Sequence, residues 1–138
     1  KQSLRRSLFK YLKEKNITCV VATHDKDDVL SYSDTMIVLH KSKIIANNTP
    51  RYLYNSPKDK LIASFFCEFN TIDGEIIYAN QLKVVEKSDL KAVVKQSYYK
   101  GYYYLIEADL KGEKVFFEHF ETFKTGEEVN LSIQKDNL

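Results

Sequence analysis

Apolar residues recur at helical spacing at the start of this chain and then form a continuous run. Between Leu4 and Lys13, leucine and aromatic side chains lie three or four positions apart among lysines and arginines, which predicts an amphipathic helix. Residues 17–22 are apolar or β-branched without interruption, as in a strand that is covered on both faces. Helix, short loop and buried strand together indicate half of a parallel βαβ unit.

The polar triplet Thr23-His24-Asp25 ends the predicted strand and leads directly into a short helix over residues 26–33. Asp25 is a favourable N-cap, and Asp27 and Asp28 place negative charge in the first turn, where the helix dipole stabilises it. Open α/β sheets bind ligands at the carboxyl ends of their strands. His24 is therefore the first candidate for a functional side chain. The alternative is that it is a polar residue at a strand end.

Three local patterns complete the first half of the chain. Residues 35–39 and 44–46 read as two strands joined by a tight turn over 40–43. Thr49-Pro50 and Ser56-Pro57 each place a capping residue before a proline, which predicts two helix starts, the second opening a helix that ends near residue 66. Because the neighbouring strands of a parallel sheet are not in this sequence, we expect the first half to need a partner.

From Glu68 onward the pattern changes to short β-type runs separated by glycine-containing turns. The runs lie at residues 75–79, 82–85, 91–97, 102–108, 115–119 and 129–134. Strands of this length and spacing are typical of a small closed or half-closed barrel or a sandwich. We therefore expect two domains, residues 1–66 and residues 67–138.

Composition narrows the class of protein only slightly. The 138 residues carry a formal charge of +2, which is too small to indicate nucleic-acid binding by itself. The two cysteines, Cys19 and Cys67, stand in apolar surroundings and suit a reducing compartment better than a disulfide framework. No apolar run approaches the roughly 18 residues that a membrane span needs. The chain begins at Lys1 in what reads as mid-helix sequence, so we expect it to be part of a longer protein.

With these elements in order, the first half resembles the C-terminal end of the ATP-binding subunit of an ABC importer related to the maltose, spermidine/putrescine and ferric-iron systems. The residues that carry the resemblance are the strand into Thr23-His24-Asp25, then Ser33-Asp34, Ile37-Val38-Leu39, Thr49-Pro50, Leu53-Tyr54, Pro57, Ala63 and Phe65. The second half is similar, more loosely, to the transport-associated, oligonucleotide-binding-like β-domain of these subunits. Its matching positions are Asn70, Gly74, Lys100-Gly101 and Gly126-Glu127-x-Val129. Ser42, Asn48 and Cys67 depart from the family, which usually has glycine at these positions.

The resemblance implies an α/β fragment from the end of a P-loop ATPase domain, followed by a small all-β barrel of the oligonucleotide-binding type. In the complete subunit His24 would be the switch histidine that reaches the γ-phosphate of ATP, with ATP and Mg²⁺ as cofactors. The parent would couple ATP hydrolysis to uptake of a polyamine, ferric iron or a sugar. This chain has no phosphate loop, no Asp-Glu strand for magnesium and no signature segment, so alone it is expected to bind no cofactor and to be inactive.

The resemblance also implies partners and a location. The expected partners are a second copy of the chain, which would bury the exposed strand and the apolar helix face, and the transmembrane permease subunits. The β-domain is expected to be regulatory and to support dimerisation. The subunit would lie in the cytoplasm, peripheral on the inner face of the cell membrane.

Other candidate residues have simpler interpretations. Cys19 and His24 could form a nucleophile pair, but a cysteine in a buried strand is more typical of a core thiol. Asp25, Asp27 and Asp28 lack the glycine and glutamate of a calcium loop, and His40 and His119 have no partner at metal-ligand spacing.

A run of five tyrosines supports a rival function. It comprises Tyr98, Tyr99, Tyr102, Tyr103 and Tyr104. Exposed tyrosines beside lysines on such a barrel could stack the bases of single-stranded nucleic acid. Alternate tyrosines in a small barrel can equally belong to its core and rim, and the low net charge favours this second interpretation. A nucleic acid is therefore not an expected partner.

Overall fold

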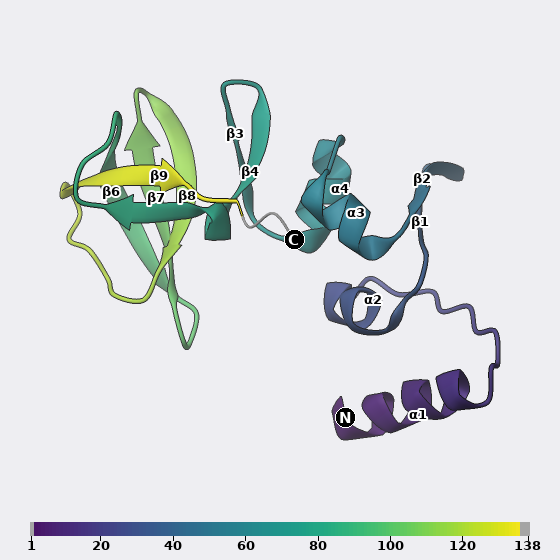
Figure 1. The fold of residues 1–138 in the computed structure, drawn as a ribbon. Coiled ribbons are helices and arrows are strands. Elements are labelled where there is room, and N and C mark those ends of the chain that lie inside the picture. The colour runs from purple at the N-terminus through teal and green to yellow at the C-terminus, as the bar shows by residue number, and fades with distance from the viewer. Residues whose placement is uncertain (1, 136–138) are drawn as a thin grey trace. The chain divides into compact units, whose positions relative to one another are not determined.

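The computed structural model describes residues 2–135, in two compact units, Lys1–Leu53 and Tyr54–Leu138 (Figure 1). The first unit is a mixed segment of short helices and one hairpin, and the second is mainly antiparallel sheet. These units describe how the chain packs and do not test where one domain ends and the next begins. The domain boundary expected after residue 66 therefore stays a prediction. None of the helices within residues 2–135 is long and apolar enough to cross a lipid bilayer.

Helix α1, Gln2–Glu14, forms where the helical spacing predicts it. It ends at Asn16, whose backbone adopts a left-handed conformation with φ of 54°. The N–H groups of Asn16 and Ile17 donate to the carbonyls of Lys13 and Leu12 at 3.1 and 2.9 Å. These two bonds are the Schellman arrangement, in which a left-handed residue closes the helix and satisfies its last carbonyls. Asparagine is one of the few residues that adopt this conformation readily.

Residues 17–24 are extended, but they are not a buried strand, so that prediction is wrong for this chain. No described strand pairs with them, and Val20 is 94% exposed. Cys19 is exposed as well, so it is not the core thiol expected from its surroundings. The physical reason is that a parallel strand is buried by its neighbours and their helices, and residues 2–135 supply none here.

The rest of the first unit matches the predicted elements closely. Helix α2 covers Lys26–Tyr32, strand β1 covers Met36–His40, and strand β2 covers Lys43–Asn48. Helix α3 covers Pro50–Asn55, and its residues up to Leu53 belong to this unit. The β1–β2 hairpin turns through Lys41 and Ser42, with φ of 50° and 63°, the pair of left-handed residues that a type I′ turn requires. At the start of α3, the hydroxyl of Thr49 accepts the N–H of Tyr52 at 3.2 Å, which confirms the predicted cap.

In the second unit, helix α4 covers Lys60–Phe66 and does not start at Ser56-Pro57 as predicted. Its N-cap is Asp59, whose carboxylate accepts the N–H of Leu61 at 2.7 Å. A carboxylate next to a helix N-terminus gains from both the hydrogen bond and the helix dipole, which explains why Asp59 caps α4. The predicted end of the helix, near residue 66, is confirmed.

A hairpin follows α4, formed by strand β3, Phe69–Ile72, and strand β4, Glu75–Tyr78. The predicted strands did not include β3. The turn between the two strands is Asp73-Gly74, with φ of 51° and 80°. This sequence is well suited to a two-residue turn in which both residues are left-handed.

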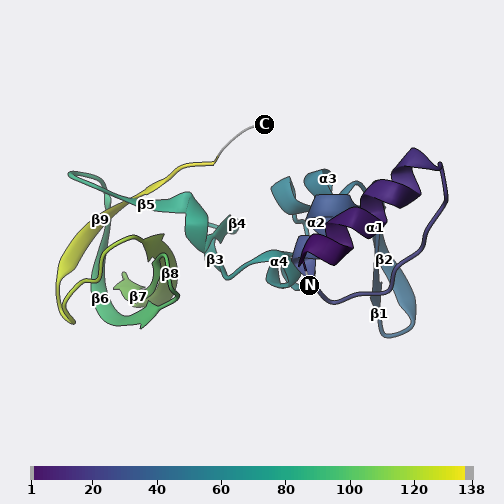
Figure 2. The same cartoon turned by 90° about the horizontal axis from the view of Figure 1, so that it is seen from below.

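The remaining strands form a five-stranded antiparallel sheet in the order β5-β9-β6-β7-β8. A short 3₁₀ turn, η1 (Ala79–Gln81), leads into β5 (Leu82–Val85). The other strands are β6 (Leu90–Tyr99), β7 (Tyr104–Leu110), β8 (Glu113–His119) and β9 (Glu128–Ile133). The sheet curls strongly (Figure 2), and β5 and β8 come close without a hydrogen-bonded ladder between them. The small sheet-rich domain expected from the sequence is thus present, but no closed barrel is found among the described strands.

The concave side of this sheet holds the main apolar core. The largest side chains buried there are Ile77, Leu82, Val94, Ile106, Phe117 and Leu131. Alternate residues of β7 and β8 point into this core, as expected for strands with one solvent-facing side.

The side chain of Asn70, in β3, forms hydrogen bonds with the backbone at the edge of β8, the last strand of the sheet. Its side-chain oxygen accepts the N–H of Phe116 at 2.6 Å, and its side-chain nitrogen donates to the carbonyl of Phe116 at 2.7 Å. The side-chain amide thus makes the pair of bonds that a peptide group of a neighbouring strand would make. Asn70 is 5% exposed, so water does not compete for these bonds.

We expect Asn70→Ala to lower the free energy of unfolding by about 1–3 kcal/mol, because both backbone groups of Phe116 lose their partner in a buried place. Thermal and urea denaturation would measure the change, and amide hydrogen exchange at Phe116 would localise it. Thr71→Ala, on the exposed side of the same strand, is the matched control. Equal stability of the two variants, with Phe116 still protected, would contradict this role.

Candidate functional site

The candidate site is the loop of residues 23–25, which joins the extended segment to α2. The N–H of Asp25 donates to the hydroxyl oxygen of Thr23 at 3.0 Å and closes a small turn with His24 in the middle. His24 lies at a bend of the chain and is exposed. The loop therefore presents an imidazole to solvent from a backbone that is tied on both sides.

Asp25 is the N-cap of α2, as predicted. Its carboxylate accepts the N–H of Asp27 at 2.9 Å. This backbone hydrogen bond is the main reason that the pKa of Asp25 lies below its ordinary value of 3.8, and the contact with Arg5 lowers the pKa further. Asp25 is thus charged at neutral pH and fixed to the first turn of the helix.

Arg5 connects this first turn to α1. Its Nη1 atom lies 2.9 and 3.0 Å from the two carboxylate oxygens of Asp28 and 3.3 Å from Oδ2 of Asp25. The side chain of Asp28 is only 14% exposed, whereas those of Arg5 and Asp25 are 42% and 39% exposed. The charge of Asp28 is the main cause that raises the pKa of Arg5 above its ordinary value.

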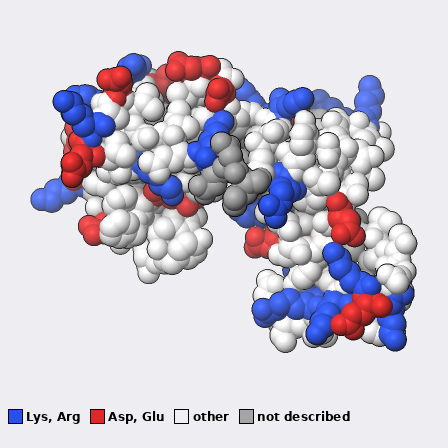
Figure 3. Space-filling view, viewed as in Figure 1, with Lys and Arg blue, Asp and Glu red and all other residues white. Residues whose placement is uncertain are grey.

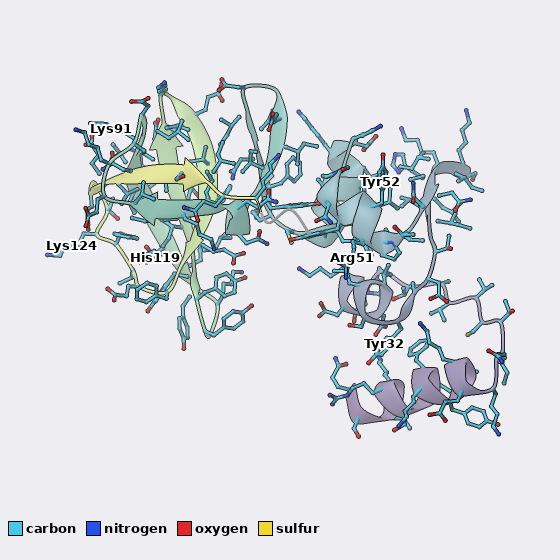
Figure 4. The ribbon with its side chains drawn as sticks, in the orientation of Figure 1. Tyr32, Arg51, Tyr52, Lys91, His119 and Lys124 are labelled. Carbon is cyan, nitrogen blue, oxygen red and sulfur yellow. The ribbon has the colours of Figure 1, made fainter. Side chains whose placement is uncertain are left out.

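Two further contacts hold α1 and α2 together. The rings of Phe9 and Tyr32 stack with centroids 4.4 Å apart, and Tyr32 extends from α2 toward α1 (Figure 4). Lys13 forms an ion pair with Asp34 at 3.2 Å. Lys and Arg side chains gather along α1 (Figure 3), and the acidic groups of residues 25–34 lie opposite two of them. Charge and ring stacking thus align the helix with the loop.

The other sequence candidates do not assemble into a second site. Within residues 2–135, Cys19 and Cys67 are not joined in a disulfide, and no three metal-ligating side chains lie close enough to hold a metal ion. Asp25 caps α2, and Asp25 and Asp28 bind Arg5, in agreement with the interpretation of these acids as a helix N-terminus. His40 lies at the exposed end of β1.

His119 lies at the end of β8, where its Nδ1 is 3.1 Å from the backbone nitrogen of Glu121 (Figure 4). Its ring stacks on that of Phe120, with centroids 4.5 Å apart. The described contacts of His119 are thus local ones at the end of its strand.

The tyrosine run lies at the hairpin between β6 and β7. Tyr99 and Tyr102 are 71% and 88% exposed, while Tyr104 packs against the core. The rings contact one another, Tyr99 with Tyr104 at 5.4 Å and Tyr102 with Tyr103 at 4.8 Å. The run therefore belongs mainly to the rim of the sheet.

Carboxylates accompany these tyrosines. The hydroxyl of Tyr98 donates to Glu107 at 3.3 Å, and the charge of Glu107 raises the pKa of Tyr98. Burial and then the charge of Glu118 raise the pKa of Tyr103. These negative charges oppose the approach of a phosphate backbone.

A hollow of about 460 Å³ in the second unit lies between the α3–α4 connection and the β3–β4 hairpin. Its lining mixes polar and apolar groups and includes Lys58, Gln81 and the ion pair of Lys135 with Glu75 at 3.2 Å. No residue of the loop 23–25 lines it. It offers no group of convergent side chains that points to a particular ligand.

Sequence reasoning predicted the capping role of Asp25, which is confirmed, and proposed His24, whose role stays a prediction, but it missed Arg5. A capping acid next to an acidic first turn is a local pattern, whereas Arg5 lies 20 positions before Asp25. The only available signal was an arginine within the amphipathic helix, and the same helix offers Arg6 as well.

The sequence was compared with known proteins. No protein family model matches the chain. The spermidine/putrescine import ATP-binding protein PotA of Clostridioides difficile is 27% identical over 100% of this chain, which covers 49% of that relative. PotA of Bacteroides thetaiotaomicron is 26% identical over 88% of the chain and 33% of the relative, and PotA of Nostoc sp. is 36% identical over 59% of the chain and 22% of the relative.

The chain thus spans about half the length, or less, of the curated relatives that it matches. The similarity to the protein of Clostridioides difficile covers the whole chain and therefore both units. The resemblance expected from the sequence is confirmed: the chain is similar over its whole length to the C-terminal part of the ATP-binding subunit of an ABC importer.

Proposed function

We propose that this chain is the C-terminal portion of an ABC importer's ATP-binding subunit, and that the complete subunit couples ATP hydrolysis to solute uptake. The observation that carries the proposal is the match of the whole chain to the C-terminal part of such subunits. A polyamine is the solute that we favour over ferric iron or a sugar, because the matching relatives carry the name spermidine/putrescine import ATP-binding protein.

His24 is the residue of this chain to which we assign a role in the reaction. Bound ATP with Mg²⁺ supplies the γ-phosphoryl group that is transferred to water. Phosphoryl transfer depends on positioning and on stabilisation of charge at the phosphoryl oxygens, and an imidazole N–H can donate a hydrogen bond to that charge. The geometry that suits this role is an exposed imidazole between two anchored neighbours, Thr23 and Asp25.

The side chains of this chain that could contact a nucleotide would form only part of a nucleotide-binding site. The sequence has no glycine-rich loop ending in Lys-Ser or Lys-Thr, and its acidic first turn after His24 is engaged by Arg5 and by the helix. We therefore assign the phosphate loop and the magnesium ligands to the part of the subunit outside this chain. On this view the 138 residues alone do not hydrolyse ATP.

The same proposal covers partners and location. A second copy of the subunit closes the nucleotide site, and the transmembrane permease subunits receive the conformational change. The subunit is cytoplasmic and peripheral on the inner face of the membrane. The β-rich unit acts as a regulatory and dimer-supporting domain, of the transport-associated type.

In the intact subunit, we expect His24→Ala to lower ATP turnover by roughly 100-fold or more, because a preorganised donor to the transition-state charge is lost. ATP affinity should change by less than about threefold, since the phosphate loop provides most of the binding. Phosphate release and nucleotide titration measure the two quantities. His40→Ala, an exposed histidine at the end of β1, is the control, and unchanged turnover in His24→Ala would refute the assigned role.

The alternative function is a single-stranded nucleic-acid-binding module, for which the exposed rings of Tyr99 and Tyr102 are the supporting observation. The carboxylates of Glu107 and Glu118 beside the tyrosine run oppose it. The net charge of +2 also provides little attraction for a polyanion.

We accordingly expect no binding of a fluorescent single-stranded DNA oligonucleotide at low salt, measured by anisotropy. A dissociation constant below about 10 µM would support the nucleic-acid function. The logarithm of the binding constant should then fall linearly as the logarithm of the salt concentration rises. Loss of such binding in Tyr99→Ala and Tyr102→Ala, but not in a Tyr52→Ala control from the first unit, would assign it to the tyrosine run.

A further inference from the structure

A single nitrogen atom of Arg5 holds the two ends of the acidic first turn of α2. Nη1 lies within 3.3 Å of Asp25 and within 3.0 Å of both carboxylate oxygens of Asp28. Asp28 belongs to α2, which begins at Lys26, and Asp25 is the N-cap of α2 and follows His24 directly. Arg5 therefore connects α1 to the residue that follows the candidate histidine.

Without a cation, this first turn contains charges that repel one another. Asp25, Asp27 and Asp28 place three carboxylates within four positions, and the side chain of Asp28 is largely withdrawn from water. A carboxylate in such surroundings needs a counter-charge, because desolvation weakens its interaction with water. The guanidinium of Arg5 supplies this counter-charge to Asp28 and Asp25 together.

The contact reaches His24 through Asp25. The backbone N–H of Asp25 is bonded to Thr23, and its carboxylate is bonded to the N–H of Asp27 and to Arg5. Asp25, which follows His24 directly, is thus bonded to α1 through Arg5, and Thr23 is bonded to Asp25. When Arg5 is removed, Asp25 keeps its helix cap but loses its connection to α1, so the loop can shift as a unit.

We infer that Arg5 is a positioning residue for His24: it fixes the loop 23–25 against α1 so that the imidazole is presented at one place. This inference rests on the proposed role of His24. Positioning matters most in the transition state, because small displacements of a catalytic group reduce turnover strongly while leaving substrate binding intact. Arg5 should therefore affect kcat and leave the KM for ATP nearly unchanged.

The first test is Arg5→Ala in the intact subunit, with Arg6→Ala as the matched control. Arg6 is the adjacent residue of α1, it is exposed, and it forms no ion pair within residues 2–135. We expect Arg5→Ala to lower kcat about tenfold with less than a twofold change in KM. Arg6→Ala should keep both values, and retained ATP binding shows that the Arg5 variant is folded.

Conservative variants separate the charge of Arg5 from its bulk. Because one nitrogen atom makes all three contacts, a lysine ammonium can occupy the same place. We expect Arg5→Lys to remain within about threefold of the unmodified kcat, and Arg5→Gln, which keeps the length but not the charge, to behave like Arg5→Ala. Equal activity of the Lys and Gln variants would overturn the inference.

A double-mutant cycle then decides whether Arg5 acts through His24. If it does, the His24→Ala/Arg5→Ala subunit turns over ATP at the rate of His24→Ala alone, because the group that Arg5 positions is already absent. If the two losses multiply, Arg5 acts independently and the inference is wrong.

The failure of this inference can be distinguished from the failure of the proposed function. Full turnover in His24→Ala removes the role of the histidine and, with it, the basis for a positioning residue. A large loss in His24→Ala together with full turnover in Arg5→Ala removes only the role of Arg5.

Discussion

The ion pair of Arg5 with Asp25 and Asp28 joins α1 to α2 at a place where apolar side chains would normally make the contact. Few large side chains are buried in this unit, while Leu4, Val20 and Leu39 are each more than two-thirds exposed. Partly exposed ion pairs contribute little net stability, because water competes with them and long side chains lose freedom. The arrangement of α1 and α2 is thus specified by charge and by the stacking of Phe9 on Tyr32, without a large stabilising term from burial.

The second unit is built on the opposite principle. Its sheet buries a continuous set of aliphatic and aromatic side chains, and burial of apolar area is the main favourable term in folding. Tyr78 extends this core toward the helices, stacking on Tyr54 at 4.7 Å and donating its hydroxyl to the carbonyl of Tyr54 at 2.8 Å. Burial raises the pKa of Tyr78, as expected for a phenol withdrawn from water. Residues 54–135 therefore contain the groups from which most of the stability arises.

Local patterns predicted the elements that depend on local chemistry. The spacing in α1, the cap at Thr49 and the glycine turns between strands are all properties of a few neighbouring residues, and the structure agrees with them. Burial of residues 17–22 was predicted wrongly, because a strand is buried by segments distant in sequence.

One short strand was missed and the start of one helix was misplaced, for related reasons. Strand β3 is only four residues long and contains a buried asparagine, so it has no clear alternating pattern. At α4, two capping signals lie three residues apart, and a pattern cannot decide between Ser56 and Asp59.

The candidate site also contains residues that local patterns indicate and one that depends on a contact between distant segments. His24 and its capping neighbour Asp25 both follow from a motif of consecutive residues; the cap is confirmed, and the role of His24 stays a prediction. Arg5 could not be found, because the contact exists only after the chain has folded back over 20 positions. Charge pairs of this kind leave no periodic trace in a single sequence.

The amide of Asn70 has a consequence for the behaviour of the protein at high concentration. An open sheet edge carries unpaired backbone groups that can recruit a strand from another molecule, which leads to aggregation. At the middle of β8, the outward-facing groups of Phe116 are already occupied by Asn70. A foreign strand that approached this edge would have to displace a buried side chain before it could pair, so a single internal residue blocks intermolecular sheet growth at that point.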